Sequence, residues 1–238
     1  MNNKKFHKIR TGVIGVGSMG QNHARVYKEI SNLVGVFDKN IVQGEKVASR
    51  LNIPFYSRIE DLLEKVDAVS IAVPTFLHLE VSKKVASFGV DMLVEKPLAM
   101  NVQESKEIID IANNAGVKLA VGHIERHNPV IRYAKSAIDR GEWGKIISLS
   151  SKRVSSYPER IKDVGVVFDL GIHDLDILSY LVGAEISSVY GVGGSVKLKE
   201  NEDFVSITLQ FKNGNVGYCE INWLTPMKVR QLNINCTS

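Results

Sequence analysis

The chain has 238 residues, of which 44% are hydrophobic and 24% are charged, and its formal net charge is +4. This length and composition allow a substantial buried core, so we expect a globular protein of one large or two modest domains. No apolar run approaches the roughly 20 residues of a membrane span, and the N-terminus lacks the apolar stretch of a signal peptide. We therefore expect a cytoplasmic protein without a membrane partner.

Apolar runs alternate with amphipathic segments through the first half of the chain. Strands are predicted at 10–17, 33–38, 53–57, 67–74, 91–97 and 117–124. Helices are predicted between them, at 19–31, 40–52, 58–65, 77–89 and 101–116. This alternation is typical of a parallel sheet wrapped by helices, so residues 1–124 are predicted to form an α/β Rossmann domain with a doubly wound sheet.

The pattern changes in residues 125–238. A helix is predicted at 128–141 and another at 174–183, whereas strands are predicted at 145–154, 186–196, 203–212, 215–224 and 230–238. Strands in succession favour an α+β domain with a mostly antiparallel open sheet. The Asn213-Gly214 pair predicts a type I′ hairpin turn. A strand without a closing helix stands last, so either the C-terminal domain is small or, as we expect, it is incomplete and the chain lacks its natural end.

Basic residues concentrate at 2–10 and 151–156, and elsewhere the two signs of charge are mixed. We interpret 2–10 as a solvated tail, not as a nucleic-acid-binding arm, since a basic excess by itself mainly affects solubility. Cys219 and Cys236 lack C-x-x-C spacing, so neither a disulfide framework nor a zinc site is predicted.

A glycine-rich turn follows the first predicted strand and begins the first predicted helix. Its residues are Gly15, Gly17, Ser18, Met19 and Gly20, and the glycines are spaced G-x-G-x-x-G. Such a turn holds a pyrophosphate on backbone N–H groups and the positive end of the helix dipole. Asp38 follows about 20 residues later, at the end of the second strand, where a carboxylate binds ribose hydroxyls and repels a 2′-phosphate. The pattern predicts NAD as the cofactor, with Lys39 weakening the preference over NADP.

The fourth and fifth strands end in "VPTFLH" and "VEKP". Ligands of doubly wound sheets gather at the carboxyl ends of the strands, next to the nicotinamide. The residues predicted to contact the cofactor there are Pro74, Thr75, His78, Glu95 and Lys96. "EKP" is also compatible with an ordinary strand exit that a proline ends. A lysine near a nicotinamide ring can, however, donate a hydrogen bond to a substrate oxygen.

In the second half, "VVFDLGIHDLD" places Asp169 and His173 four residues apart, with Asp174 and Asp176 beyond. At helical spacing the first two side chains share a face. A histidine beside a carboxylate can take a hydroxyl proton. A metal site is less favoured than acid–base chemistry, because no third ligand appears at a recognisable spacing.

The motifs "GVGSMG", "VPTFLH", "EKP", "GHIERHNP" and "FDLGIHDLD", in this order, resemble the glucose-fructose oxidoreductase and inositol dehydrogenase family, Gfo/Idh/MocA. The resemblance covers essentially the whole chain. It implies an NAD-dependent sugar dehydrogenase in which Lys96, Asp169 and His173 form the catalytic group and contact the substrate. It also implies a homo-oligomer, a dimer or a tetramer, assembled through the C-terminal sheet.

The segment "GHIERHNP", residues 122–129, is similar to family members that oxidise C3 of nucleotide-linked N-acetylglucosamine or its uronic acid. His127 stands where those members usually have phenylalanine. The resemblance implies that Arg126 and Asn128 bind the sugar, although a salt bridge to a neighbouring acid is an equal alternative for Arg126. Two other functions stay open: a dehydrogenase of a free sugar or polyol such as inositol or glucose, and a noncatalytic NAD-binding sensor.

Overall fold

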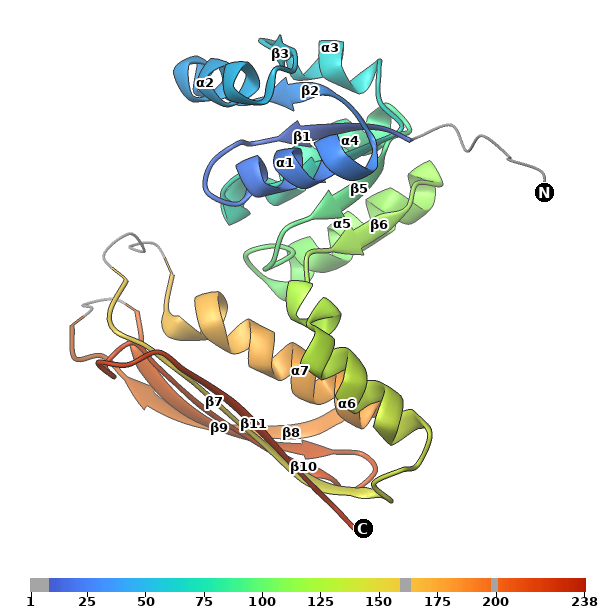
Figure 1. Ribbon diagram of the computed structural model, residues 1–238. Coiled ribbons are helices and arrows are strands. Elements are labelled where there is room, and N and C mark those ends of the chain that lie inside the picture. Colours follow the sequence, from blue (N-terminus) through green and yellow to red (C-terminus); the bar gives the residue numbers. More distant parts are fainter. Residues whose placement is uncertain (1–8, 159–163, 198–200) are drawn as a thin grey trace. The chain divides into compact units, whose positions relative to one another are not determined.

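The computed structural model describes residues 9–158, 164–197 and 201–238 (Figure 1). The basic segment predicted as a tail lies outside these residues except at its last two positions. By its internal contacts the chain divides into two units, residues 1–122 and 123–238; the sequence predicted the boundary after residue 124. In the described part of the chain, no helix is long and apolar enough to cross a membrane.

The first unit is a parallel sheet of six strands in the order β3-β2-β1-β4-β5-β6. Its strands are β1 (Arg10–Ile14), β2 (Asn32–Phe37), β3 (Phe55–Tyr56), β4 (Ala68–Ile71), β5 (Asp91–Val94) and β6 (Leu119–Val121). Its helices are α1 (Gly20–Ile30), α2 (Ile41–Leu51), α3 (Ile59–Leu63), the short η1 (Thr75–Leu77), α4 (His78–Ser87) and α5 (Val102–Ala115). The predicted doubly wound fold is confirmed, and the strand order reverses between β1 and β4.

Both faces of this sheet are buried, which explains the continuous apolar runs of its strands. Val13 and Ile14 are adjacent on β1 and face opposite sides. Val13 packs with Ala24 of α1 and Val47 of α2, whereas Ile14 belongs to the cluster that includes Leu62 of α3, Val85 of α4 and Ala112 of α5. The sheet is thereby held rigidly between two helical layers.

The second unit is a five-stranded sheet in the order β11-β7-β10-β9-β8, antiparallel except for the β7–β10 pair. Its elements are η2 (Ile124–His127), α6 (Pro129–Asp139), β7 (Ile146–Val154), η3 (Val167–Gly171), α7 (Ile172–Val182), β8 (Ile186–Gly194), β9 (Phe204–Phe211), β10 (Val216–Asn222) and β11 (Val229–Cys236). Both long helices cover one face of the sheet (Figure 1). The predicted mostly antiparallel α+β fold is confirmed.

The β9–β10 hairpin is present, but its predicted turn type is wrong. A type I′ turn needs a positive φ at both central residues, and of the Asn213-Gly214 pair only Gly214 has one, +88°. The Gly214 N–H donates to the carbonyl of Phe211 (2.9 Å), and the Phe211 N–H donates to the carbonyl of Asn215 (3.0 Å). This is the longer loop in which a left-handed glycine forms a bulge.

Candidate functional site

The glycine turn of the first unit is shaped to bring backbone close to a ligand. Gly15 adopts φ +82°, and a Cβ on Gly20 would lie 1.8 Å from the Gly15 carbonyl oxygen, so both positions require glycine for the turn itself. A Cβ on Gly17 would meet no atom within 4 Å. Gly17 therefore faces the open space at the start of α1, where a pyrophosphate approaches the backbone.

Asp38 is held in place beside this turn. Its carboxylate accepts hydrogen bonds from the backbone N–H groups of Val16 (2.7 Å) and Asn40 (2.8 Å), one on each oxygen. Each oxygen keeps a further acceptor position, which suits the two hydroxyls of a ribose. Gln43 belongs to no motif and was not predicted; its side-chain amide donates to the Val16 carbonyl (2.9 Å) and fixes the turn from α2.

A groove of about 910 Å³ opens in the first unit beside Gly15, Gly17 and Asp38. Its apolar lining includes Phe37, Ile59, Val73, Pro74, Leu77 and Val81. An ion pair between Lys84 and Glu60 (2.6 Å) lies on its wall. Apolar walls with a fixed carboxylate match an adenosine, so the residues present fit the dinucleotide that the sequence predicts.

Three of the residues predicted to contact the cofactor lie just after β4. Pro74 lines the groove, and Thr75 is half-buried at the start of η1. His78 is only 1% exposed, and its ring nitrogens lie 3.0 Å from the carbonyl oxygens of Val73 and Pro97. The predicted contact of His78 with the cofactor stays a prediction. His78 joins the loop after β4 to the loop after β5.

Glu95 and Lys96 follow the last residue of β5, at the carboxyl edge of the sheet. The Glu95 N–H donates to the carbonyl of Ile71 in β4 (2.9 Å), so the exits of the two strands are tied together. The Glu95 side chain is largely buried and pairs with His23 of α1. Lys96 is half-buried. The lysine thus lies at the carboxyl edge of the sheet, and its predicted place beside the nicotinamide stays a prediction.

In the second unit, Asp169 lies in the π-helical turn η3 and His173 in the first turn of α7. Both side chains are half-buried. The predicted helix starts earlier than expected because the π-helical turn runs directly into α7. Single π-helical turns are frequent at functional sites.

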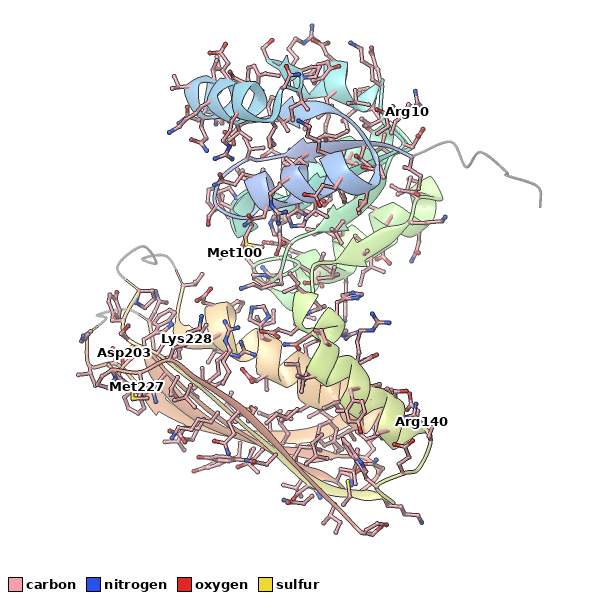
Figure 2. All side chains as sticks on the ribbon, in the orientation of Figure 1. Arg10, Met100, Arg140, Asp203, Met227 and Lys228 are labelled. Atoms are coloured by element: carbon pink, nitrogen blue, oxygen red, sulfur yellow. The ribbon has the colours of Figure 1, made fainter. Side chains whose placement is uncertain are left out.

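Backbone contacts attach this turn to one end of the sheet. The Val166 N–H donates to the backbone carbonyl of Glu202 (2.9 Å), just before β9, and the Val167 N–H donates to the Glu202 carboxylate (3.0 Å). Figure 2 shows the next residue, Asp203, at this end of the sheet together with Lys228. Asp169 and His173 are therefore carried on a segment anchored to the sheet.

The segment 122–129 is engaged within the second unit. Arg126 makes a bidentate salt bridge to Asp176 of α7 (2.5 and 2.8 Å) and lies over the ring of Tyr180. The salt bridge weighed as the alternative for Arg126 is thus present. The Asn128 side chain accepts from the Val130 N–H (3.1 Å) and caps α6. The predicted sugar contacts of Arg126 and Asn128 stay predictions.

A buried ion cluster that no sequence motif predicted joins the same segment to α7. Arg153 of β7 donates to Asp174 (2.5 Å) and to Glu125 (3.0 Å), and Arg230 of β11 lies 3.6 Å from Glu125. Burial raises the pKa of Asp174 above its usual range although Arg153 opposes the shift. Burial also acts to raise the pKa of Glu125, but Arg153, Asn128 and Arg230 together bring it below the usual range.

Removing Arg153 should destabilise the second unit strongly. Arg153 and Asp174 are 5% and 4% exposed, so Arg153→Met leaves two carboxylates without their buried cation. We expect urea denaturation to show a loss of about 3–5 kcal/mol at neutral pH. The loss should shrink as the pH falls below neutral, because burial raises the pKa of Asp174, the loss of Arg153 raises it further, and protonation removes the unpaired charge.

The matched control for Arg153 is its neighbour Lys152, which pairs with Glu220 (2.9 Å) on the exposed side of the sheet. Lys152→Met should cost less than about 1 kcal/mol, as exposed pairs do. Equal losses for the two variants would show that burial of the cluster does not matter.

The structure gives no sign of metal or thiol chemistry within its described residues. In this part of the chain, no group of three or more His, Cys, Asp or Glu side chains is placed to hold a metal ion. Cys219 and Cys236 are free thiols. Burial raises the pKa of the Cys219 thiol to about 12, which keeps it protonated and unreactive at neutral pH.

Comparison with known proteins agrees with both halves of the fold. A family model described as an oxidoreductase family with an NAD-binding Rossmann fold matches residues 9–123, and the model of that family's C-terminal domain matches residues 131–238. The chain belongs to the Gfo/Idh/MocA family. Its first unit is accordingly the NAD-binding Rossmann domain, and the prediction of NAD is confirmed.

Three relatives of this Gfo/Idh/MocA chain bear on its substrate. It is 38% identical to a UDP-N-acetylglucosamine 3-dehydrogenase of Acidithiobacillus ferrooxidans, over 87% of this chain and 65% of that protein. A solved structure of the same name and organism has a TM-score of 0.90 and 34% identity to this chain. The match covers 96% of this chain and 72% of the chain in that structure. It is 34% identical to a scyllo-inositol 2-dehydrogenase of Bacillus subtilis over 92% of this chain and 69% of that protein. The WlbA dehydrogenase of Bordetella pertussis, solved with NADH and UDP-GlcNAcA, has a TM-score of 0.89 and 25% identity, covering 98% of this chain and 72% of that one. The chain thus spans less than two thirds of the first relative's length.

Cofactor choice should depend on Asp38. We expect the unaltered chain to bind NAD more tightly than NADP, because the fixed carboxylate repels a 2′-phosphate. Asp38→Ala should reduce the ratio of the NAD affinity to the NADP affinity by roughly tenfold, which corresponds to about 1.4 kcal/mol. Fluorescence titration with both cofactors measures it, with Asp61→Ala as the control. Equal affinities of the unaltered chain for NAD and NADP would contradict the assignment.

Proposed function

We propose that this chain is an NAD-dependent dehydrogenase that oxidises a secondary hydroxyl of a sugar, at C3 of a nucleotide sugar such as UDP-N-acetylglucosamine or its uronic acid. The observation that carries the proposal is the joint presence of an intact dinucleotide cradle, Lys96 at the exit of β5, and Asp169 with His173 at the start of α7. A noncatalytic NAD sensor has no evident need for all three side chains.

The proposed chemistry divides the reaction among these side chains. His173 removes the proton of the sugar hydroxyl as general base. Lys96 donates a hydrogen bond to that oxygen and stabilises its developing negative charge. Asp169 orients the histidine or the lysine. Bound NAD accepts the hydride, so the chain's own contribution is alignment and electrostatics.

The nucleotide-sugar assignment is supported by the relatives and by the segment 122–129. The relatives named for UDP-N-acetylglucosamine and solved with UDP-GlcNAcA match nearly all of this chain. Arg126 keeps 42% of its side chain exposed despite its salt bridge to Asp176. In this proposal that exposed part of the guanidinium, with Asn128, binds the sugar.

A free polyol is the second candidate substrate, because this chain is also similar to the scyllo-inositol 2-dehydrogenase. The same three side chains serve that reaction. The two candidates differ in whether binding requires a nucleotide diphosphate. Competition by UDP against the substrate separates them, since a polyol enzyme has no site for the diphosphate.

We also propose that two or four copies of this chain assemble through the sheet of the second unit. The face of the sheet opposite its helices exposes Tyr190 (71%), Val192 (55%), Tyr218 (41%) and Val216 (42%). Apolar and aromatic side chains gathered on one face are typical of protein interfaces. Light scattering on the purified chain measures the assembly, and a monomer at all concentrations would contradict it.

The proposed function is tested by following NADH formation with a panel of substrates. The panel contains UDP-N-acetylglucosamine, its uronic acid, free N-acetylglucosamine, scyllo-inositol and glucose. We expect turnover with the nucleotide sugars and little with the free compounds. Preference for inositol or glucose would favour the second candidate. Tight NAD binding with no turnover of any compound would overturn the dehydrogenase assignment.

A further inference from the structure

A chain of polar side chains lies within the first unit, and the proposed reaction does not use it. Glu95 at the end of β5 is 2.7 Å from Nε2 of His23 on α1. Nδ1 of His23 is 3.0 Å from the hydroxyl of Ser70 on β4, which donates in turn to the hydroxyl of Tyr27 (2.7 Å). The chain thus links three elements, α1, β4 and β5.

This arrangement is not explained by stability. Ser70 is 0% exposed, and the side chains of His23 and Glu95 are 15% and 12% exposed. Buried polar groups cost free energy even when they are paired, and well-packed apolar residues often serve stability equally well. A fully hydrogen-bonded network does, however, define one geometry more narrowly than apolar packing does.

The geometry that this network defines is that of the backbone carrying Lys96. The second oxygen of Glu95 accepts from the Lys96 N–H (3.1 Å). A Cβ on Gly122 would lie only 3.1 Å from the Glu95 carboxylate, so the exit of β6 leaves that side chain little freedom. Burial acts to raise the pKa of Glu95, but the hydrogen bond and charge of His23 bring it below the usual range, so the carboxylate stays ionised at neutral pH.

The other end of the network belongs to the phosphate-binding helix. α1 begins at Gly20, the last glycine of the turn, and His23 lies in its first turn. A ligand that orders this end of α1 therefore acts on a helix whose side chain is bonded directly to Glu95.

We propose that His23 is a positioning residue that couples cofactor binding at the start of α1 to the placement of Lys96, through its hydrogen bond to Glu95. The inference rests on the role given to Lys96 in the proposed function. It assigns His23 no contact with substrate. It predicts that NAD bound at the glycine turn restricts the motion of the backbone at Glu95 and Lys96.

Three variants separate this coupling from a general effect on packing. His23→Leu removes the donor to Glu95, whereas His23→Gln places an amide N–H where Nε2 lies and keeps it. Arg25→Ala is the matched control. Arg25 is an exposed residue of the same helix and pairs with Glu29, one helical turn away. Circular dichroism and urea denaturation establish that each variant is folded.

The decisive measurement is amide hydrogen exchange of the peptide containing Lys96, with and without NAD, which needs no turnover. NAD should slow exchange there in the unaltered chain, in Arg25→Ala and in His23→Gln. In His23→Leu the NAD-dependent slowing should fall by roughly tenfold, because the local opening is no longer linked to the cofactor. In turnover, His23→Leu should lower kcat by about 10-fold to 100-fold with a smaller change in KM.

Equal exchange and equal kcat in His23→Leu and the unaltered chain would overturn the coupling. Equal defects in His23→Leu and His23→Gln would overturn it too, since the hydrogen bond would then be irrelevant. The proposed function fails separately: if Lys96→Met keeps full turnover, Lys96 has no catalytic role, whereas the exchange result still reports the link between His23 and the β5 exit.

Discussion

Replacing Gly17 by valine should abolish NAD binding and leave the fold intact. No atom lies within 4 Å of a Cβ at this position, so the apo protein accommodates the side chain. The same open space is where the pyrophosphate meets the backbone, and the branched side chain fills it. We expect isothermal titration to show NAD affinity reduced by roughly 100-fold or more, equivalent to about 2.8 kcal/mol.

Two comparisons make the Gly17 result specific. Gly17→Ala adds a single methyl group and should give an intermediate loss of affinity. Gly20→Ala should instead destabilise the fold, because its Cβ would lie 1.8 Å from the Gly15 carbonyl oxygen. Thermal unfolding without ligand should therefore leave Gly17→Val unchanged and lower the Tm of Gly20→Ala. A folded Gly17→Val chain that binds NAD normally would show that the pyrophosphate lies elsewhere.

Loss of His173 should have the largest effect on turnover. If His173 removes the hydroxyl proton, His173→Ala should lower the oxidation rate by about 10² to 10⁴, the usual contribution of a positioned general base. NAD affinity should survive, because the cofactor groove is lined by residues of the first unit. Stopped-flow measurement of NADH formation gives the rate, and titration gives the affinity.

Lys96→Met provides the partner experiment, since methionine is similar in length but uncharged. It should cost a comparable factor by removing the donor to the developing alkoxide. The double variant should lose less than the product of the two factors if both residues act as one unit. Lys118→Met, at an exposed lysine of the same unit, is the control. Full turnover in the His173 or Lys96 variant would remove that residue from the mechanism.

Much of the fold was predictable because it depends on local periodicity. Each predicted strand and helix of the first unit is present, since apolar runs between amphipathic segments have few arrangements other than a parallel sheet with helices on both faces. The glycine turn was predictable for a similar reason: its spacing reflects backbone conformations and close approaches that only glycine allows. Asp38 followed from its distance along the chain to that turn.

The partners of the polar side chains were less predictable. His78 follows a strand end, and only the structure shows that it is buried against backbone carbonyls. His23 and Gln43 were missed because neither belongs to a motif, although each fixes a functional segment. A signal for His23 existed in its spacing from Tyr27, since the two lie one helical turn apart on the face of α1 that packs on the sheet.

By itself the sequence determined the order of the elements, the doubly wound and antiparallel sheets, the dinucleotide turn and the identity of its acidic partner. These features depend on residues close together in the chain, where spacing alone defines geometry. Only the tertiary structure decided that Arg126 pairs with Asp176, that Arg153 joins Glu125 to Asp174, and that Glu95 is bonded to His23. Those pairings join residues far apart in sequence, and a charged side chain has many possible partners until packing leaves one within hydrogen-bonding distance.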